Sequence, residues 1–406
     1  MENINTKLDK ISAKRIINDV GGTGQPPLYG YQFFSAGLEE YIKTIEEEYL
    51  DDYIKYGGSS FKLVVGAYGG GKTHFLYNIQ GKSWDSNYIT AYIELSPNST
   101  PFHKLEQVYK SIVSNLLYPQ DSETLIEGYD KGIEAAIKSW YGQKYIEFSE
   151  TFPQDELEGE INDYVSNLGP YESTSFKNAM KNAFLAQHNE NEETFNLIIQ
   201  WLKGENPPKA TLKDVQIFEK IDKTTAFKML RCLIQWIWDI NYSGLIVLMD
   251  EAEQTPSMTT KQRNTLLQNL RELIDACSRG GLKGTMVFYA VPDESFLEGR
   301  TAVYEALNQR LETIFEGEIN PTGVKIDLEN ISSNPIDLLN EIGKKLARIY
   351  EIAYNMNFEE AVINDKIQEI AEKAYNEERF GEIGYKRNFV QQIIQSFHAL
   401  KANSKK

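Results

Sequence analysis

The sequence predicts an α/β fold in which a parallel sheet is flanked by helices, with a helical insertion and a C-terminal helical lobe. Short apolar runs alternate with segments of helical periodicity over the first 330 residues or so. Such alternation implies a parallel sheet covered on both faces. Two stretches break the alternation: residues 118–223 carry no strand pattern, and only helical patterns follow Asn334.

The composition and net charge limit the classes of function that the protein can have. The chain has 406 residues and a net charge of −17, so its surface repels nucleic acid on average. DNA binding would need a local basic channel or a partner. No stretch is long and apolar enough to cross a bilayer, the first residues lack the apolar core of a secretory signal, and Cys232 and Cys277 fit reduced packing residues. We therefore expect a cytoplasmic protein.

The N-terminal part is expected to hold a loop, a helix and the first strand. "VGGTGQPPLYG", residues 20–30, is rich in Gly and Pro and predicts irregular structure. Residues 35–56 start with a serine and repeat apolar side chains at helical spacing. "FKLVV", residues 61–65, predicts a buried strand, and residues 72–82 predict a helix that stops near Gly81.

The middle of the chain is expected to add a second strand before the insertion. "YITAYIEL", residues 88–95, is rich in β-branched and aromatic residues and predicts that strand. A helix is predicted over residues 100–117, and the acidic, polar insertion follows. A strongly apolar helix over residues 224–240 then leads back to the sheet.

Three further strands complete the predicted sheet. "LIVLM" at residues 245–249 is a buried-strand pattern, and an amphipathic helix over residues 261–280 follows it. "GTMVFYAVPD" at 284–293 and "VKIDLENIS" at 324–332 predict the other two.

These elements suggest three parts. Residues 1–60 form an N-terminal arm and helix, and residues 61–330 form the core around the sheet, which contains the insertion. Residues 331–406 form a C-terminal helical lid.

A phosphate-binding loop pattern joins the first strand to the next helix. Gly66 is followed by four residues and then by Gly71, Lys72 and Thr73. Glycines let consecutive backbone N–H groups turn toward an anion, the helix adds the positive end of its dipole, Lys72 can bridge the β- and γ-phosphates, and Thr73 offers a hydroxyl to Mg²⁺. A plain Gly-rich turn is the alternative, which the strand–loop–helix context disfavours. The predicted nucleotide-binding residues are Gly66, Ala67, Tyr68, Gly69, Gly70, Gly71, Lys72, Thr73 and His74.

Two carboxylates follow the strand at residues 245–249. Asp250 is expected to hold Mg²⁺ through water, and Glu251 to polarise the attacking water as general base. The alternative is an aspartate that caps a helix after an ordinary strand. Their position downstream of a phosphate loop favours Mg-ATP hydrolysis.

Together these motifs resemble the additional-strand P-loop class, AAA+, and more specifically the BREX-system ATP-binding protein family (BrxD-like) of bacterial and archaeal phage defence. The resemblance covers both ends and the middle of the chain and fades over residues 118–223. The matching segments are "RIINDVGGTGQPP", "FSAGLEEYI", "LVVGAYGGGKTHFL", "GLIVLMDEAEQT", "NLRELIDACSRGGLKGTMVFYAVPDESF", "YEALNQRL" and "YKRNFVQQII".

The resemblance implies roles for further residues. The strand "TMVFYAVPD" takes the place of a sensor strand, but Val291 cannot hydrogen-bond phosphate, so sensing would pass to Asp293 or Tyr289 or be weak. Arg310 stands where such proteins place an arginine finger for a neighbouring subunit. A surface arginine paired with Glu305 or Glu312 is an equal alternative.

Arg387, at the start of a C-terminal helix, resembles the lid arginine that contacts phosphate in the same chain. Its alternative is a solvated arginine, which would oppose the helix dipole. Gly21–Gly24 and Tyr29 would wrap the adenine, unless this arm is disordered. His74 faces either the nucleotide or the core, and packing is the safer interpretation for one histidine there.

Two functions stay open at this point. The favoured one is an ATPase that acts as a switch or motor with other defence-system proteins, possible DNA and a possible ATP-dependent homo-oligomer, with ATP and Mg²⁺ as cofactors. The other is a nucleotide-dependent assembly module that hydrolyses slowly or not at all. A small-molecule phosphotransferase is disfavoured by the acidic pair at the strand end.

Overall fold

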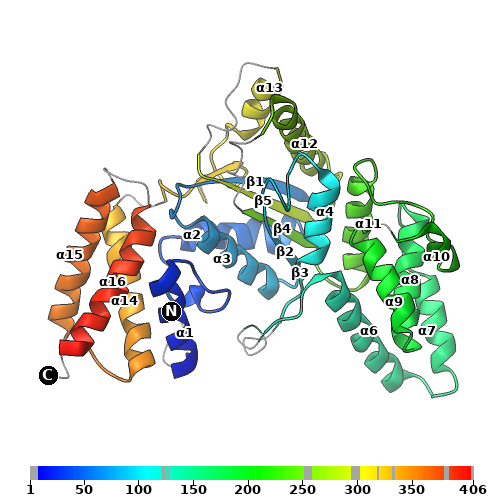
Figure 1. The fold of residues 1–406 in the computed structure, drawn as a ribbon, viewed down its shortest axis with the longest axis horizontal. Coiled ribbons are helices and arrows are strands. Elements are labelled where there is room, and N and C mark those ends of the chain that lie inside the picture. Colours follow the sequence, from blue (N-terminus) through cyan, green and yellow to red (C-terminus); the bar gives the residue numbers. More distant parts are fainter. Residues whose placement is uncertain are drawn as a thin grey trace.

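The structure is a computed structural model (Figure 1). It describes residues 8–120, 125, 128–205, 207–250, 258–293, 302–317, 320–331, 334–378 and 384–403.

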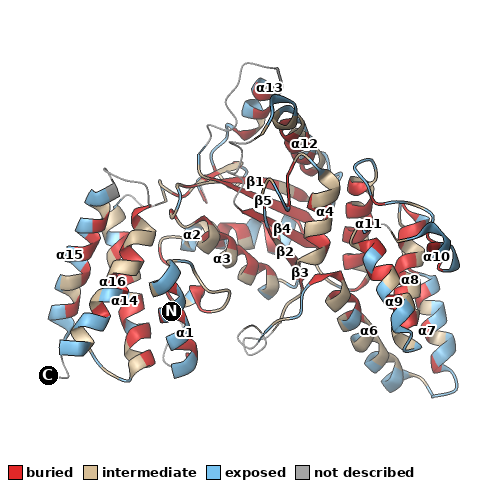
Figure 2. Cartoon of the chain, viewed as in Figure 1, coloured by how far each residue is buried: buried red, intermediate tan, exposed pale blue. Residues whose placement is uncertain are grey.

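A mostly parallel sheet forms the centre of the molecule, as the sequence predicts. Its order is β3-β2-β4-β5-β1-β6, and only the short edge strand β3 runs antiparallel to its neighbour. The strands are β1 (Ser59–Val65), β2 (Ile89–Glu94), β3 (Leu116–Leu117), β4 (Leu245–Asp250), β5 (Thr285–Val291) and β6 (Lys325–Asp327). Strands β4 and β5 are entirely buried and β1 nearly so, which is why they read as largely apolar runs (Figure 2).

Helices cover the two faces of the sheet, and alternate residues of each strand point to opposite faces. In β4, Ile246 and Leu248 pack with α2 (Glu39–Ile45), the π-helical segment η3 (Glu46–Tyr53) and α3 (Lys72–Asp85). Leu245, Val247 and Met249 face the other side. That side is covered by α4 (Leu105–Ser114), α11 (Ala226–Asp239), α12 (Thr260–Ser278) and α13 (Ala302–Leu311).

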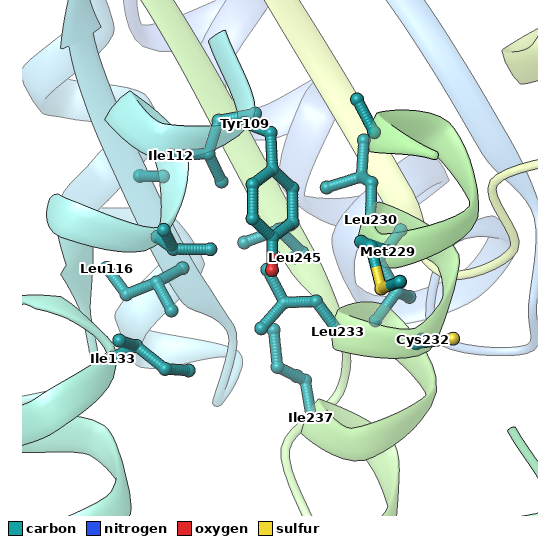
Figure 3. Close-up of a cluster of buried hydrophobic side chains, with 14 of the residues drawn as sticks. Tyr109, Ile112, Leu116, Ile133, Met229, Leu230, Cys232, Leu233, Ile237 and Leu245 are labelled. Carbon is teal, nitrogen blue, oxygen red and sulfur yellow. The ribbon is translucent and has the colours of Figure 1, made fainter. Parts of the chain in front are cut away.

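The insertion is helical and lies to one side of the sheet (Figure 1). It contains α6 (Gly132–Thr151), α7 (Leu157–Ser166), α8 (Thr174–His188), α9 (Glu192–Leu202) and α10 (Lys209–Asp214). Figure 3 shows its junction with the sheet, where Ile133 of α6 belongs to the same buried cluster as Tyr109 of α4, Ile237 of α11 and Leu245 of β4. The apolar core therefore continues from the sheet into the insertion.

A separate helical lobe lies on the opposite side of the sheet. Its helices α14 (Pro335–Tyr354), α15 (Glu360–Glu378) and α16 (Tyr385–Asn403) share one apolar cluster with α1 (Lys10–Thr23). The first sixty residues thus divide between two cores, because α1 packs on this lobe while α2 and η3 pack on the sheet. The domain limits at residues 60 and 330 remain predictions.

The glycine-rich N-terminal segment is more regular than expected. Irregular structure was predicted from residue 20, but α1 continues through Gly21 and Gly22 and ends at Thr23. The reason is close packing, since a Cβ on Gly21 would lie 2.8 Å from Ile394 Cγ2. The glycine allows α1 to approach α16, and the left-handed Gly24 (φ 67°) then ends the helix.

Three other local predictions were wrong. Helix α3 does not stop at Gly81, whose missing side chain instead admits the Tyr31 hydroxyl, 2.0 Å from where a Cβ would stand. Leu116 and Leu117 leave the predicted helix and pair with β2 as strand β3. The helix predicted from Ser35 begins only at Glu39.

Two smaller findings concern membranes and cysteines. None of the helices within the described ranges combines the length and apolar character needed to cross a membrane. Cys232 and Cys277 are buried free thiols, as the sequence predicts.

Candidate nucleotide-binding site

The loop between β1 and α3 has the backbone of an anion-binding cradle. Gly69 (φ 79°) and Gly71 (φ 102°) adopt left-handed conformations that residues with a Cβ rarely adopt. Gly66 anchors the loop by donating its N–H to Val291 O of β5 at 3.1 Å. Helix α3 begins immediately after the loop at Lys72, so its first N–H groups point toward the loop.

Lys72 is folded back along this loop. Its Nζ donates to Gly66 O at 2.9 Å and to Ala67 O at 3.3 Å, and its side chain is 7% exposed. Lys72 itself lines a pocket, together with the other residues of the segment 68–74. The ammonium group is therefore held at the wall of the pocket.

Asp250 lies opposite, at the carboxyl end of β4. Its Oδ2 accepts hydrogen bonds from Thr73 Oγ1 and from Tyr92 Oη, both at 2.7 Å, and the residue is 1% exposed. Burial and the neighbouring negative charge of Asp250 raise the pKa of Tyr92. The buried Asp250 carboxylate and the half-buried hydroxyl of Thr73 together form an oxygen pair of the kind that Mg²⁺ prefers.

The loop is braced by residues that the sequence analysis missed. Glu329, just after β6, accepts the Ala67 N–H on Oε1 at 3.0 Å. Lys386 Nζ of α16 donates to Gly70 O and Leu328 O, both at 2.9 Å, and Gly384 N donates to Tyr68 O at 2.8 Å. The helical lobe is thus bonded directly to the backbone of the loop.

Arg387 follows Lys386 but takes another direction. Its guanidinium lies over the Tyr68 ring, 4.9 Å from the centroid, and both residues line the pocket. A Cβ on Gly24 would lie 2.7 Å from Arg387 Cγ, so the end of α1 closes over this arginine. Arg387 therefore places a cation at the pocket rather than in open solvent.

The rest of the pocket is apolar and lies between the sheet and the helical lobe. Gly24, Gln25 and Pro26 line it, but Tyr29 instead packs edge-on against Phe33 with 5.9 Å between ring centroids. The apolar lining residues are Val20, Phe34, Ala36, Leu38, Leu328, Ile331, Leu338, Ile342 and Val390.

His74 packs against neighbouring side chains, as the safer of the two interpretations expects, and it also lines the pocket. Its ring centroid is 5.0 Å from that of Phe34, and its Nε2 is 2.7 Å from Ser35 Oγ. Burial, with the charges of Lys386 and Lys345, lowers the pKa of His74 to about 4. The imidazole is therefore neutral at physiological pH.

Arg310 lies away from this pocket. Its Nε and Nη2 donate to the carboxylate of Asp275 on α12, at 2.6 and 3.2 Å, and this hydrogen bonding, together with the positive charge, lowers the pKa of Asp275. The alternative interpretation expected Arg310 to pair with Glu305 or Glu312. It was wrong about the partner, which is Asp275. An aspartate 35 positions away was not foreseeable from local spacing.

The predicted base and sensor residues can be followed only in part. Glu251 lies outside the described residues, which end this strand at Asp250. Val291 and Tyr289 are fully buried in β5, and Asp293 follows β5 within the described chain. Among the described residues, no group of three or more His, Cys, Asp or Glu side chains is arranged to hold a metal ion.

The comparisons with known proteins bear on this pocket. No curated protein and no solved structure matches the chain. The family model described as BREX system ATP-binding protein BrxC/D matches residues 9–406, nearly the whole chain, and this confirms the resemblance. Such membership gives the protein an ATP-binding role in a phage-defence system. The chain thus belongs to the BREX system ATP-binding protein BrxC/D family.

Proposed function

We propose that this protein binds Mg-ATP between the sheet and the helical lobe and hydrolyses it as an AAA+ ATPase. The observation that carries the proposal is the convergence of the glycine loop, the buried Lys72 and the Thr73–Asp250 pair on one pocket. The sheet order supports the class, because the additional strand β5 separates β1 from β4.

The two halves of the pocket suit the two halves of ATP. Apolar side chains from α1, α14 and α16 offer a slot for the base. The amides at the start of α3, with Lys72 and Arg387, offer positive potential to the phosphates. The base is thus held mainly by the lobe and the phosphates mainly by the loop.

A magnesium ion fits this arrangement. Thr73 and Asp250 would hold it, and two protein oxygens suffice because Mg²⁺ keeps several waters and binds through substrate phosphates. When bound, the ion would neutralise charge on the phosphates.

Glu251 is the proposed general base. In Glu251→Gln, turnover is expected to fall about a thousandfold because the amide cannot accept a proton. ATP affinity should stay unchanged, since the loop contacts remain. Glu253→Gln, the same chemical change two residues further on, is the matched control and should hydrolyse ATP like wild type. Equal turnover in wild type and Glu251→Gln would remove the assigned base.

The slow assembly module remains the second candidate, favoured by Val291. Its side chain is fully buried and cannot hydrogen-bond phosphate, so β5 offers no polar sensor at this position. A wild-type protein that binds ATP tightly but turns over no faster than Glu251→Gln would establish this alternative.

Partners follow from the family. We place the activity in the cytoplasm, together with other defence-system proteins. Because the net charge is −17, the protein would act on DNA only through a partner or a local basic channel. Arg310 would act in trans only if its pair with Asp275 opens. An ATP-driven increase in solution mass, measured with and without Mg²⁺, would support that role, and an unchanged monomer would contradict it.

A further inference from the structure

A tyrosine on the strand next to Asp250 has a geometry that the proposed hydrolysis does not yet use. Tyr92 lies on β2, and Thr90, Tyr92 and Glu94 alternate toward the α3 face of the sheet. The register pairs Glu94 with Asp250, so Tyr92 stands two positions before the acid on the adjacent strand. The tyrosine hydroxyl therefore reaches Asp250 across one strand spacing.

The hydrogen bond from Tyr92 is directed at the same oxygen that Thr73 uses. Tyr92 Oη and Thr73 Oγ1 both donate to Asp250 Oδ2 at 2.7 Å, one from β2 and the other from α3. Two donors from different elements fix both the position and the rotation of the carboxylate. Because Asp250 is only 1% exposed, water cannot easily replace a lost donor.

Tyr92 is itself held rigidly. Its strand lies between β3 and β4, and its ring packs against Tyr77 of α3 with 5.2 Å between centroids. A donor on a packed strand keeps its position better than one on a loop. Thr73, in contrast, would also have to serve as a metal ligand.

We propose that Tyr92 is a positioning residue that holds the Asp250 carboxylate in the orientation required for the divalent metal ion of the bound nucleotide. This inference rests on the proposed function, because it assumes that Thr73 and Asp250 receive the ion. Tyr92 itself would contact neither nucleotide nor metal.

The test is a metal titration of the full chain saturated with a non-hydrolysable ATP analogue. Mn²⁺ is the probe, and its free concentration is read by electron paramagnetic resonance. In Tyr92→Phe, Mn²⁺ affinity should fall about tenfold, which corresponds to about 1.4 kcal/mol. Affinity for the analogue in EDTA should not change, which separates positioning of the acid from damage to the pocket.

Tyr77→Phe is the matched control. It removes a hydroxyl from the ring that packs on Tyr92 but leaves the Tyr92–Asp250 bond in place, so Mn²⁺ affinity should stay at the wild-type value. Unchanged Mn²⁺ affinity in Tyr92→Phe, or an equal loss in Tyr77→Phe, would overturn the inference alone. Failure of the wild-type chain to bind the analogue would instead overturn the proposed function.

Discussion

Two buried lysines, one within strand β1 and one in the segment that follows it, differ in their surroundings. Lys62 lies within the strand and is 1% exposed, while Lys72 follows its carboxyl end and is 7% exposed. Both ammonium groups donate to backbone carbonyls. Their surroundings separate them, since Lys72 lines the pocket and Lys62 is enclosed.

Lys62 is enclosed by acceptors and rings. Its Nζ donates to Tyr49 Oη at 2.8 Å, to Pro321 O at 3.1 Å and to Gly323 O at 2.6 Å, and lies 4.8 Å from the Phe315 ring centroid. Burial lowers the pKa of Lys62 to about 7. The comparison teaches that burial of a lysine alone does not indicate a ligand site; an adjoining cavity does.

The largest expected difference between Lys72 and Lys62 is in their effect on nucleotide affinity. Lys72→Ala should lower ATP affinity at least about a hundredfold, because the triphosphate loses its only cation rooted in the loop. Lys62→Met should bind ATP like wild type, because its side chain does not reach the pocket. Isothermal titration calorimetry on both variants checks this. A comparable loss in Lys62→Met would break the distinction between the two lysines.

The next effect is on stability and depends on pH. The pKa of Lys62 is about 7 in the native state and 10.5 in the reference state, so between these values the unfolded chain binds the extra proton. Stability conferred through this group therefore rises with pH. The free energy of unfolding of wild type minus that of Lys62→Met should grow by roughly 2 kcal/mol from pH 7 to pH 9.

Denaturant unfolding of both proteins at the two pH values measures this difference. The contributions of the titratable groups that both proteins share cancel when the two free energies are subtracted. Parallel pH profiles would show that Lys62 does not titrate in this range.

The smallest effect concerns the third cation, Arg387. Arg387→Ala should weaken ATP binding about tenfold, because one charge contact to phosphate is lost at a partly exposed site. Adenosine binding, which involves no phosphate, should not change. Arg387→Lys keeps the charge but loses the contact of the guanidinium with the Tyr68 ring, and should recover most of the affinity. Equal loss for ATP and adenosine would assign Arg387 to the shape of the pocket.

The parallel sheet and the pocket-lining loop could be predicted because their causes are local. A run of five residues that is apolar except for Lys62, then glycines at fixed spacing, then Lys72 and Thr73 determine strand, loop and helix from neighbouring residues alone. Asp250 was predictable for the same reason, as the first polar residue after a buried strand. That it meets Thr73 follows from the carboxyl ends of parallel strands sharing one edge.

The remaining parts depend on contacts between distant segments. Tyr92 reads as an ordinary strand residue until the register of β2 with β4 is known. The only available signal was the alternation of residues 90, 92 and 94 within β2, which places them on one face of the sheet. Lys386 and Glu329 brace the loop only because the lobe and the end of β6 meet there. The packing of Gly21 on Ile394 was likewise hidden in the sequence.

A crystal structure of the full chain with a non-hydrolysable ATP analogue and Mg²⁺ tests the central claim most directly. We predict that the triphosphate lies against the amides of residues 69–73, with the Lys72 ammonium turned to it and the metal between Thr73 and Asp250. Analogue bound elsewhere, with Lys72 still on the Gly66 and Ala67 carbonyls, would contradict the account.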